Sequence, residues 1–401
     1  MKISLKRLIY NIIAFLICIM AILGVSEDYF PVYRTVKYVL IVVNGLYLLP
    51  KLPVLIKRKH LGMNLLLLMF FLVVLFVSYA NISGLKMRNP FLAAIVFCAI
   101  QAEVFWFIEY SAEQRLIPDL INMSYIGTLL LVAINDTIVM LEPTFYNEYN
   151  GYVLGTKFSV SYMHLVLISL FLVNSELKRR GKIKTSFILG IYIILSFCIT
   201  TTVNCNTGTI GVVLFLVFYC LFKFASKALR KPGVFIAALM VSLAFVIICE
   251  LLLLNPWIQK IVTEVLDRTL TLTGRVHIYS SIGNVLQGHY WGGYGYGSSY
   301  EICLRYLGYA DAQNGLLDWI LQIGVPGTIF FVAICYRSFY ATSKVKTFSK
   351  IFVPIMCFLY VLAILGMVEI TLRGLFLFFI ALLYGCASAN LNLRGEEEYE
   401  G

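Results

Sequence analysis

Charged residues are scarce in this sequence of 401 residues. Asp, Glu, Lys and Arg make up 13% of it, whereas about a quarter is usual in soluble globular proteins. Hydrophobic residues make up 60%, which is more than a water-soluble fold of this size normally carries. The composition therefore predicts a polytopic membrane protein. It argues against a soluble enzyme, a disordered or fibrous chain and a nucleic-acid-binding protein.

Motifs for metals and soluble cofactors are also missing. The ten cysteines and four histidines form no Cys-x-x-Cys pair and no Cys/His cluster, so neither a zinc site nor a redox dithiol is expected. No Asp-x-Asp motif is present, which disfavours metal-dependent use of a nucleotide sugar. We therefore expect no metal and no cofactor. Cys205 and Cys303 both fall on the predicted outer side, but their separation in sequence gives little reason to expect a disulfide.

Apolar segments long enough to cross a bilayer recur along the chain. A membrane helix needs about 20 apolar residues, and this length predicts an all-α protein with about twelve transmembrane helices. The predicted spans are 8–24, 36–56, 63–80, 90–108, 120–141, 158–174, 185–203, 209–225, 233–254, 313–336, 351–368 and 372–390.

Lys and Arg are distributed unevenly between the two sets of loops. Of the 32 cations, 22 lie in the set that contains the N-terminus, and the positive-inside rule places this set, with both termini, in the cytoplasm. Lys86 and Arg88 run against the trend, because they fall on the outer side. Most of the net charge of +11 thus indicates orientation and not an anionic partner.

One connection is much longer than the others and divides the chain. Residues 1–254 hold nine spans, 255–312 form a large outer loop, 313–390 hold three spans, and 391–401 are an acidic cytoplasmic tail. A loop of this length in a tight bundle is usually functional. Helical spacing within it predicts two amphipathic helices. Their apolar faces are Ile258, Ile261, Val262, Val265 and Leu266 in the first, and Tyr279, Ile282, Val285 and Leu286 in the second, near 275–287.

A glycine-rich segment, residues 292–297, follows the second predicted helix. Its glycines would let the backbone approach a ligand closely, but the segment lacks the Gly-Lys-Ser/Thr ending of a nucleotide-binding loop. The interleaved rings have flat faces of the kind that stack on sugars: Trp291, Tyr294, Tyr296 and Tyr300. The alternative is a turn within an aromatic belt at the membrane surface.

Four short motifs occur in order between residues 270 and 330: Thr273-Gly274-Arg275, Gly292-Gly293-Tyr294-Gly295-Tyr296-Gly297, Gln313-Asn314-Gly315-Leu316-Leu317-Asp318 and Gly324-Val325-Pro326-Gly327. With the layout of spans and one large outer loop late in the chain, they resemble the O-antigen ligase and polymerase superfamily. The chain looks most like a Wzy-type capsular or exopolysaccharide repeat-unit polymerase. Gln313 stands where the ligase branch has a His that acts as the base or assists the acceptor, and this departure favours a polymerase.

The resemblance implies a GT-C-like glycosyltransferase in a bacterial plasma membrane. It would transfer a glycan from undecaprenyl pyrophosphate to a sugar hydroxyl of another lipid-linked repeat unit on the outer face. The implied partners are the undecaprenyl-pyrophosphate-linked oligosaccharide, membrane lipid, a flippase and a chain-length regulator, with no nucleic acid.

Such a reaction requires cations for the leaving pyrophosphate and a base for the acceptor hydroxyl. Arginine matches phosphate oxygens, so Arg275 is the first candidate, followed by Arg305, Arg373 and Lys157. The candidate bases are Asp311, which precedes Gln313 by two residues, and Glu301, His277, His289 and Glu369. The matched motifs add Asn314 to the catalytic set. They also suggest substrate contacts at Gly293, Tyr294, Gly295, Tyr296, Gln313 and Asp318.

Structural interpretations of these residues remain open. Arg275 would anchor the loop to lipid headgroups, Asp311 would cap the next helix, and Glu369 and Arg373 would form an i, i+4 ion pair. Other functions also remain open: a ligase of the same superfamily, a flippase or transporter of lipid-linked oligosaccharides, and a membrane protein without catalysis. A transporter would more often show internal repeats, and none is evident.

Overall fold

In the computed structural model, residues 4–22, 32–142, 151–260, 263–264, 274–345 and 349–389 are described. Their regular structure is helical throughout, apart from an isolated bridge between Tyr152 and Gly155. The predicted tail at 391–401 lies outside these residues, as do Ile261, Val262, Val265 and Leu266 of the first predicted loop helix. Of that helix, α11 (Pro256–Lys260) and residues 263–264 are described.

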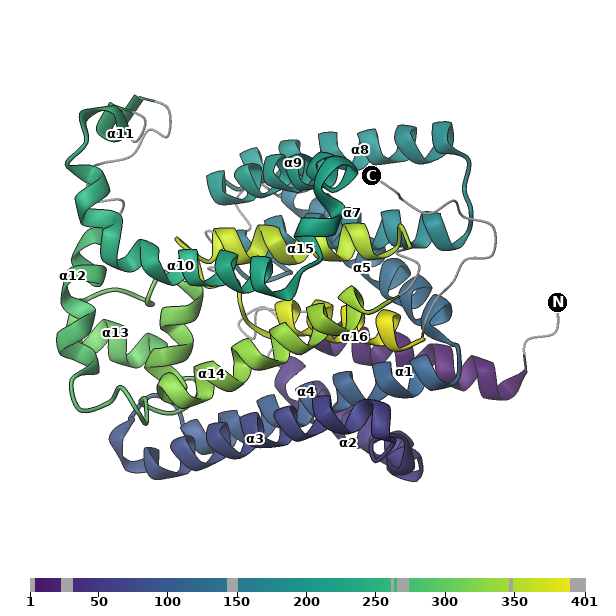
Figure 1. The fold of residues 1–401 in the computed structure, drawn as a ribbon, viewed down its shortest axis with the longest axis horizontal. Coiled ribbons are helices and arrows are strands. Elements are labelled where there is room, and N and C mark those ends of the chain that lie inside the picture. The colour runs from purple at the N-terminus through teal and green to yellow at the C-terminus, as the bar shows by residue number, and fades with distance from the viewer. Residues whose placement is uncertain are drawn as a thin grey trace.

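Ten helical segments are long and apolar enough to cross a membrane. Most of them run along the long axis of the molecule, whereas α2 is seen close to end-on (Figure 1). They are α1 (Leu5–Ile22), α2 (Tyr33–Leu48) continued by the 3-10 helix η1 (Leu49–Val54), α3 (Arg58–Ala80), α4 (Pro90–Glu113), α5 (Ile117–Leu141), α7 (Lys157–Leu177), α8 (Lys182–Thr202), α9 (Asn206–Leu229), α10 (Pro232–Leu253) and α14 (Gly315–Ser343).

Two further apolar helices are shorter. α15 (Phe352–Leu365) has 14 residues and α16 (Gly374–Ala389) has 16. At 1.5 Å per residue these lengths give about 21 and 24 Å, less than the roughly 30 Å of a hydrocarbon core. Each of the twelve predicted spans therefore contains a helix, and the multi-pass membrane class is confirmed. The count of twelve crossings stays a prediction.

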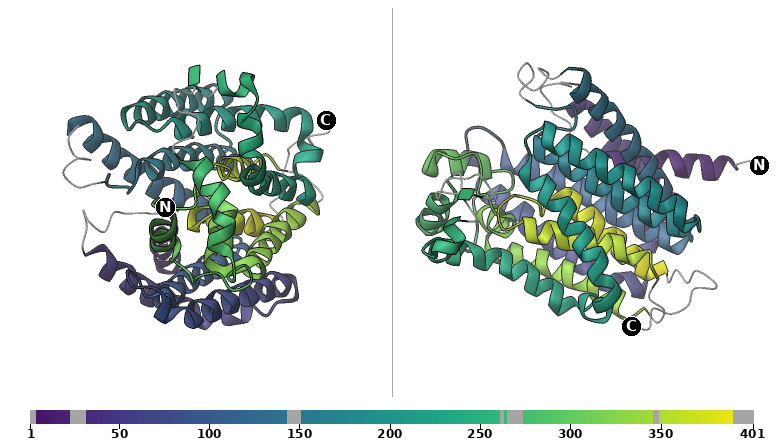
Figure 2. Two further views of the ribbon diagram at one scale, coloured as in Figure 1. Left: turned by 90° about the vertical axis from the view of Figure 1, so that its left-hand side faces the viewer. Right: turned by 90° about the horizontal axis from the view of Figure 1, so that it is seen from above.

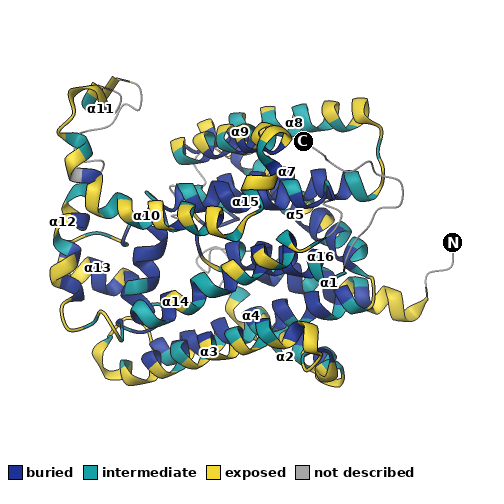
Figure 3. Ribbon diagram, in the orientation of Figure 1, coloured by how far each residue is buried: buried dark blue, intermediate teal, exposed yellow. Residues whose placement is uncertain are grey.

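The two short helices occupy the centre of the bundle. Most residues of α15 and α16 are buried and none is exposed (Figure 3), and the two helices pack against α4, α7, α9, α10 and α14. The surrounding helices point large apolar side chains outward, for example Phe76 at 73% exposure and Ile183 at 89%. A surface of this kind is expected to face lipid. The connection between α15 and α16 belongs to this central layer and forms part of the site described below.

The large loop gathers at one end of the bundle. α12 (Arg275–Leu286) and α13 (Ser299–Leu307) lie there, opposite the end that carries the N-terminus (Figures 1 and 2). α12 confirms the second predicted loop helix, and its apolar face is buried as expected. α13 is an additional helix that the sequence analysis did not identify.

The glycine-rich segment packs against a kink in α14. Gly324 breaks this helix at φ 69°, and a Cβ there would lie 2.4 Å from the Trp291 carbonyl oxygen. A Cβ on Gly293 would lie 2.6 Å from the Gln322 carbonyl carbon. The Tyr294 amide donates to the Leu321 carbonyl at 2.9 Å. The close approach that Gly293 and Gly324 allow is thus between two backbone segments of the protein, and ligand contact at the other glycines stays a prediction.

Two of the four rings that were expected to stack on sugars stack on other side chains of the protein. Tyr296 stacks on Phe97 with ring centroids 4.4 Å apart, and Tyr294 stacks on His289 at 3.8 Å. One face of each ring therefore contacts the protein, and stacking of these two tyrosines on a sugar stays a prediction. Trp291 and Tyr300 are 77% and 54% exposed and keep open faces.

Candidate functional site

A cavity of about 400 Å³ opens at the end of the bundle where the large loop lies. It is bounded by the end of α1, the first turns of α7, Asp311, and the segment from Glu369 to Leu375. Its lining combines ionisable side chains with apolar ones such as Ile22, Phe158 and Met163. The cavity therefore suits a ligand with both a polar and an apolar part.

Arg275 joins α12 to the connection between α15 and α16. Gly274 precedes it at φ 87°, where a Cβ would lie 2.2 Å from the Tyr309 ring, so the turn into α12 requires glycine. The Arg275 guanidinium donates to the Val368 carbonyl at 3.0 Å and to Glu369 Oε1 at 2.8 Å. Both side chains are largely buried, with 15% and 7% exposure. The predicted pyrophosphate-binding arginine thus already holds a carboxylate.

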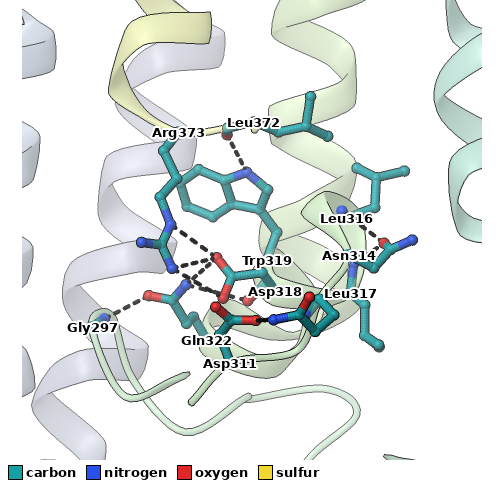
Figure 4. A network of polar contacts seen from close by, with 11 residues as sticks. Gly297, Asp311, Asn314, Leu316, Leu317, Asp318, Trp319, Gln322, Leu372 and Arg373 are labelled. Carbon is teal, nitrogen blue, oxygen red and sulfur yellow. Dashed lines mark hydrogen bonds and ion pairs between the residues drawn. The ribbon is translucent and has the colours of Figure 1, made fainter. Parts of the chain in front are cut away.

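Gln313, which stands where the ligase branch of the resembled superfamily has a His, positions Asp311 through two hydrogen bonds. The Gln313 backbone amide donates to Asp311 Oδ1 at 2.9 Å, and its side-chain amide donates to the same oxygen at 2.6 Å (Figure 4). Gln313 adopts φ 50°, a left-handed conformation that is uncommon for a non-glycine residue and concentrates at functional sites. The N-cap of α14 is Asn314 and not Asp311, because the Asn314 side chain accepts from the Leu316 and Leu317 amides.

Asn314 links three segments of the protein through its side chain. It is fully buried, and its side chain also donates to the Ser242 carbonyl at 2.8 Å and to the Met367 carbonyl at 3.3 Å. It therefore ties α14 to α10 and to the connection after α15. The residues that line the cavity do not include it.

A second charged pair connects α14 to the start of α16. Arg373 contacts both oxygens of Asp318 at 3.3–3.4 Å. Gln322, one turn along α14, donates to Asp318 at 2.8 Å and accepts from the Gly297 amide at 2.6 Å (Figure 4). Asp318 is buried, whereas the Arg373 side chain is 54% exposed and borders the cavity. Buried Asp318 therefore holds the Arg373 guanidinium in place, and the charge of Arg373 faces the cavity.

The expected ion pair between Glu369 and Arg373 is wrong. Arg275 pairs with Glu369, and Asp318 pairs with Arg373. The i, i+4 rule holds for helices, but Glu369 and Arg373 lie in the non-helical connection between α15 and α16. Their side chains can therefore bind partners from α12 and α14.

Burial governs the acidity of the two carboxylates in the cavity. Burial raises the pKa of Glu369 to about 7, and the positive charges of Arg275 and Lys157 moderate the rise. Burial also raises the pKa of Asp311, against the hydrogen bonds from Gln313. A carboxyl group that titrates near neutral pH is suited to proton transfer. Lys157 begins α7, and its ammonium lies 3.4 Å from the Asn204 carbonyl oxygen.

Glu301 and Arg305 lie outside the cavity. They pair with each other on α13, and Glu301 accepts from the Lys86 and Met87 amides at 2.8–3.0 Å. Burial alone would raise the pKa of Glu301, but these amides and Arg305 lower it. This arrangement fastens α13 to the loop after α3. It gives Glu301 no position from which to act as a base in the cavity.

The remaining polar candidates of the loop also lie elsewhere. His289 stacks on Tyr294, and the ring of His277 lies 6.0 Å from that of Tyr309. Cys205 and Cys303 are both free thiols, so the structure forms no disulfide between them.

Sequence reasoning missed three residues of the site. Tyr162 of α7 lines the cavity, and its buried hydroxyl has no hydrogen-bond partner among the described residues. The Tyr279 hydroxyl lies within hydrogen-bond distance of the Gln313 and Met367 carbonyls, at 2.7 and 2.8 Å. The i, i+4 spacing of Asp318 and Gln322 on a predicted helix could have identified Gln322 as a hydrogen-bond partner of Asp318. Nothing in the apolar sequence around Tyr162 distinguishes it from a core residue.

No family model, curated protein or solved structure matches this chain. The fold and the cavity define a class: an α-helical protein of the multi-pass membrane type, with a charged cavity at one end of its bundle.

Proposed function

We propose that the protein is a polysaccharide polymerase. It transfers a glycan from undecaprenyl pyrophosphate to a lipid-linked repeat unit on the outer face of a bacterial plasma membrane, with both termini in the cytoplasm. One observation carries the proposal. Glu369, whose pKa burial raises to about 7, shares a cavity of about 400 Å³ with the accessible guanidinium of Arg373. The ordered motifs of the large loop support the choice of substrate.

In this proposal Glu369 is the base. It takes the proton of the acceptor hydroxyl as that oxygen attacks the anomeric carbon of the donor sugar. The bond from that carbon to the pyrophosphate oxygen breaks, and the pyrophosphate leaves with the electron pair. Arg373 and Lys157 stabilise the negative charge that develops on it. Arg275 is a positioning residue, because it fixes the Glu369 side chain and limits its pKa.

In this proposal other residues of the cavity orient the acceptor and bind the lipid. Asp311 is the second carboxylate of the cavity and orients the acceptor through the oxygen that Gln313 leaves available. The apolar lining from α1 and α7 contacts the first isoprene units of the lipid. Twelve membrane crossings complete the proposed topology, and Glu369 and Arg373 lie in the connection between the short helices α15 and α16.

Deletion of the gene in its native host tests the proposal against its alternatives. A polymerase predicts that single repeat units remain where polymer is normally found, visible on a gel of surface glycans. Restoring the wild-type gene should restore the polymer, and Glu369→Gln should not. Failure of lipid-linked units to reach the outer leaflet would indicate a transporter instead. Normal polymer that is not attached to its final acceptor would indicate a ligase.

A further inference from the structure

A second large cavity lies at the opposite end of the bundle. Its volume is about 680 Å³, and it is an open cavity bordered by the start of α1, η1, the turn between α4 and α5, and the first turn of α5. α1 begins at this cavity and ends at the candidate site. The two cavities are thus separated by the length of a membrane helix, and the second has no part in the proposed transfer reaction.

The charges around this cavity are strongly unbalanced. Four cationic side chains line it, Lys6, Arg7, Lys51 and Arg115, but only one carboxylate, Asp119. Arg7 occupies that carboxylate through two hydrogen bonds, of 3.0 and 2.8 Å. No other described carboxylate forms an ion pair with the remaining three cations. Three segments of the chain, α1, η1 and the turn between α4 and α5, therefore direct positive charge into one concave space.

Aromatic residues form one wall of the cavity and shape it. The Tyr10 hydroxyl lies 2.7 Å from Ser111 Oγ and 3.2 Å from the Leu116 carbonyl, and its ring stacks on Phe107. Lys51 lies over the Tyr47 ring, 3.0 Å from its centroid. These contacts hold Tyr10 and Lys51 in the positions that shape the cavity.

Arg115 occupies a position where glycine is usual. It has φ 58° and follows the end of α4. The Leu116 amide donates to the Ser111 carbonyl at 2.8 Å and the Arg115 amide to the Ala112 carbonyl at 3.3 Å. This pair of bonds is a Schellman motif, whose left-handed residue is most often glycine. An arginine there adds backbone strain and places a guanidinium at the cavity.

We propose that this cavity binds the phosphate group of an anionic lipid headgroup. The cavity lies at the ends of apolar helices, where lipid headgroups are expected, and Ile9 and Leu116 offer an apolar border. Basic pockets between membrane helices are suited to such headgroups. Arginine and lysine supply charge-assisted hydrogen bonds to phosphate oxygens. The proposal does not rest on the transferase function.

The structure provides a closely matched pair of variants. Arg179 follows the end of α7 with φ 48°, and the same pair of backbone bonds surrounds it, from Arg180 to Ser175 and from Arg179 to Glu176. It lies outside the cavity lining. Arg115→Gly and Arg179→Gly each remove one positive charge and relieve one left-handed arginine. Both should leave the thermal unfolding midpoint unchanged or higher, so the comparison does not depend on a damaged fold.

The test is binding of short-chain phosphatidylglycerol to the full-length protein in neutral detergent, measured by native mass spectrometry. Phosphatidylcholine of the same chain length is the uncharged comparison. We expect the wild type to favour phosphatidylglycerol, Arg115→Gly to weaken its binding about tenfold, and Arg179→Gly to leave it unchanged. Lys6→Gln, at an exposed position, should also weaken it.

Three results would overturn the proposal. They are equal binding of the two lipids by the wild type, equal effects of Arg115→Gly and Arg179→Gly, and complete displacement of phosphatidylglycerol by millimolar inorganic phosphate. The last result would assign the cavity to free phosphate. Lipid binding that inorganic phosphate leaves intact supports the headgroup.

Discussion

Burial raises the pKa of Glu369, and the residues next to it in the sequence do not predict this shift. Transfer of a carboxylate out of water disfavours its charged form, and this raises the pKa of Glu369 to about 7. The opposing influence is Arg275, which donates to Glu369 Oε1 at 2.8 Å. The pKa of the proposed base thus depends mainly on desolvation, which raises it, and on Arg275, which lowers it, with smaller effects of Asp311 and Lys157.

Arg275→Gln should shift this balance in a defined direction. Without the positive charge, the pKa of Glu369 rises further, and the group becomes protonated over a wider range of pH. Because only the carboxylate accepts a proton, the rising limb of the pH–rate profile should move to alkaline pH, and the rate at pH 7 should fall roughly tenfold. The measurement is transfer rate against pH for the purified variant in nanodiscs.

Lys260→Gln is the control for this shift. Lys260 is an exposed cation of the same loop, 3.7 Å from Glu264 and outside the cavity lining. Its pH–rate profile should coincide with that of the wild type. An unchanged profile for Arg275→Gln would show that Glu369 is not the group that titrates.

At the scale of elements, the kink in α14 and the glycine-rich segment form one unit. Gly293 and Gly324 allow the two backbones to meet, and the Gln322 carbonyl accepts from the Gly295 amide at 2.8 Å. Through Gln322, the same unit supports Asp318 and hence Arg373. The glycine motif is therefore linked to the cavity through packing and through Gln322.

Gly293→Ala should destabilise this unit. The alanine Cβ would meet the Gln322 carbonyl carbon at 2.6 Å, at a residue with φ 59°. Overpacking and a left-handed alanine together should cost about 2 kcal/mol or more, seen as a lower thermal midpoint in detergent. Gly292→Ala is the matched comparison, because a Cβ there meets nothing within 4 Å. Equal midpoints for the two variants would refute the packing role.

The elements differ in how far the sequence could predict them. Hydropathy predicted a helix at 120–141, and the structure has α5 at Ile117–Leu141. Helical spacing predicted a helix near 275–287, and the structure has α12 at Arg275–Leu286. Both signals are local. The pairing of Arg275 with Glu369 joins residues 94 positions apart, and no local pattern encodes it. Local spacing suggested Glu369–Arg373 instead, and this was wrong because the segment is not helical.

The whole molecule separates two chemical environments along one axis. The cavity with Glu369 and Arg373 lies at the end that carries the large loop, and the basic cavity near Lys51 lies at the other end. The cations of the loops predict that the second end faces the cytoplasm. The proposed transfer reaction requires the first end to face outward.

Cysteine labelling in intact cells tests this orientation. Ser280 of α12 is exposed at the loop end, and Lys184 at the start of α8 is exposed at the other. A membrane-impermeant maleimide should label Ser280→Cys in intact cells, above the background of the native cysteines. Lys184→Cys should be labelled only after the cells are opened. The reverse pattern would place the cavity on the cytoplasmic side and exclude the proposed reaction.

The central claim is that Glu369 accepts the proton in a glycan transfer from a lipid pyrophosphate. Its most direct test is release of undecaprenyl pyrophosphate from lipid-linked repeat units by the purified protein in nanodiscs. The wild type should release it together with lengthened glycan. Glu369→Gln, with unchanged folding and substrate binding, should be slower by about 10²–10⁴-fold. Equal rates for the two proteins would contradict the account.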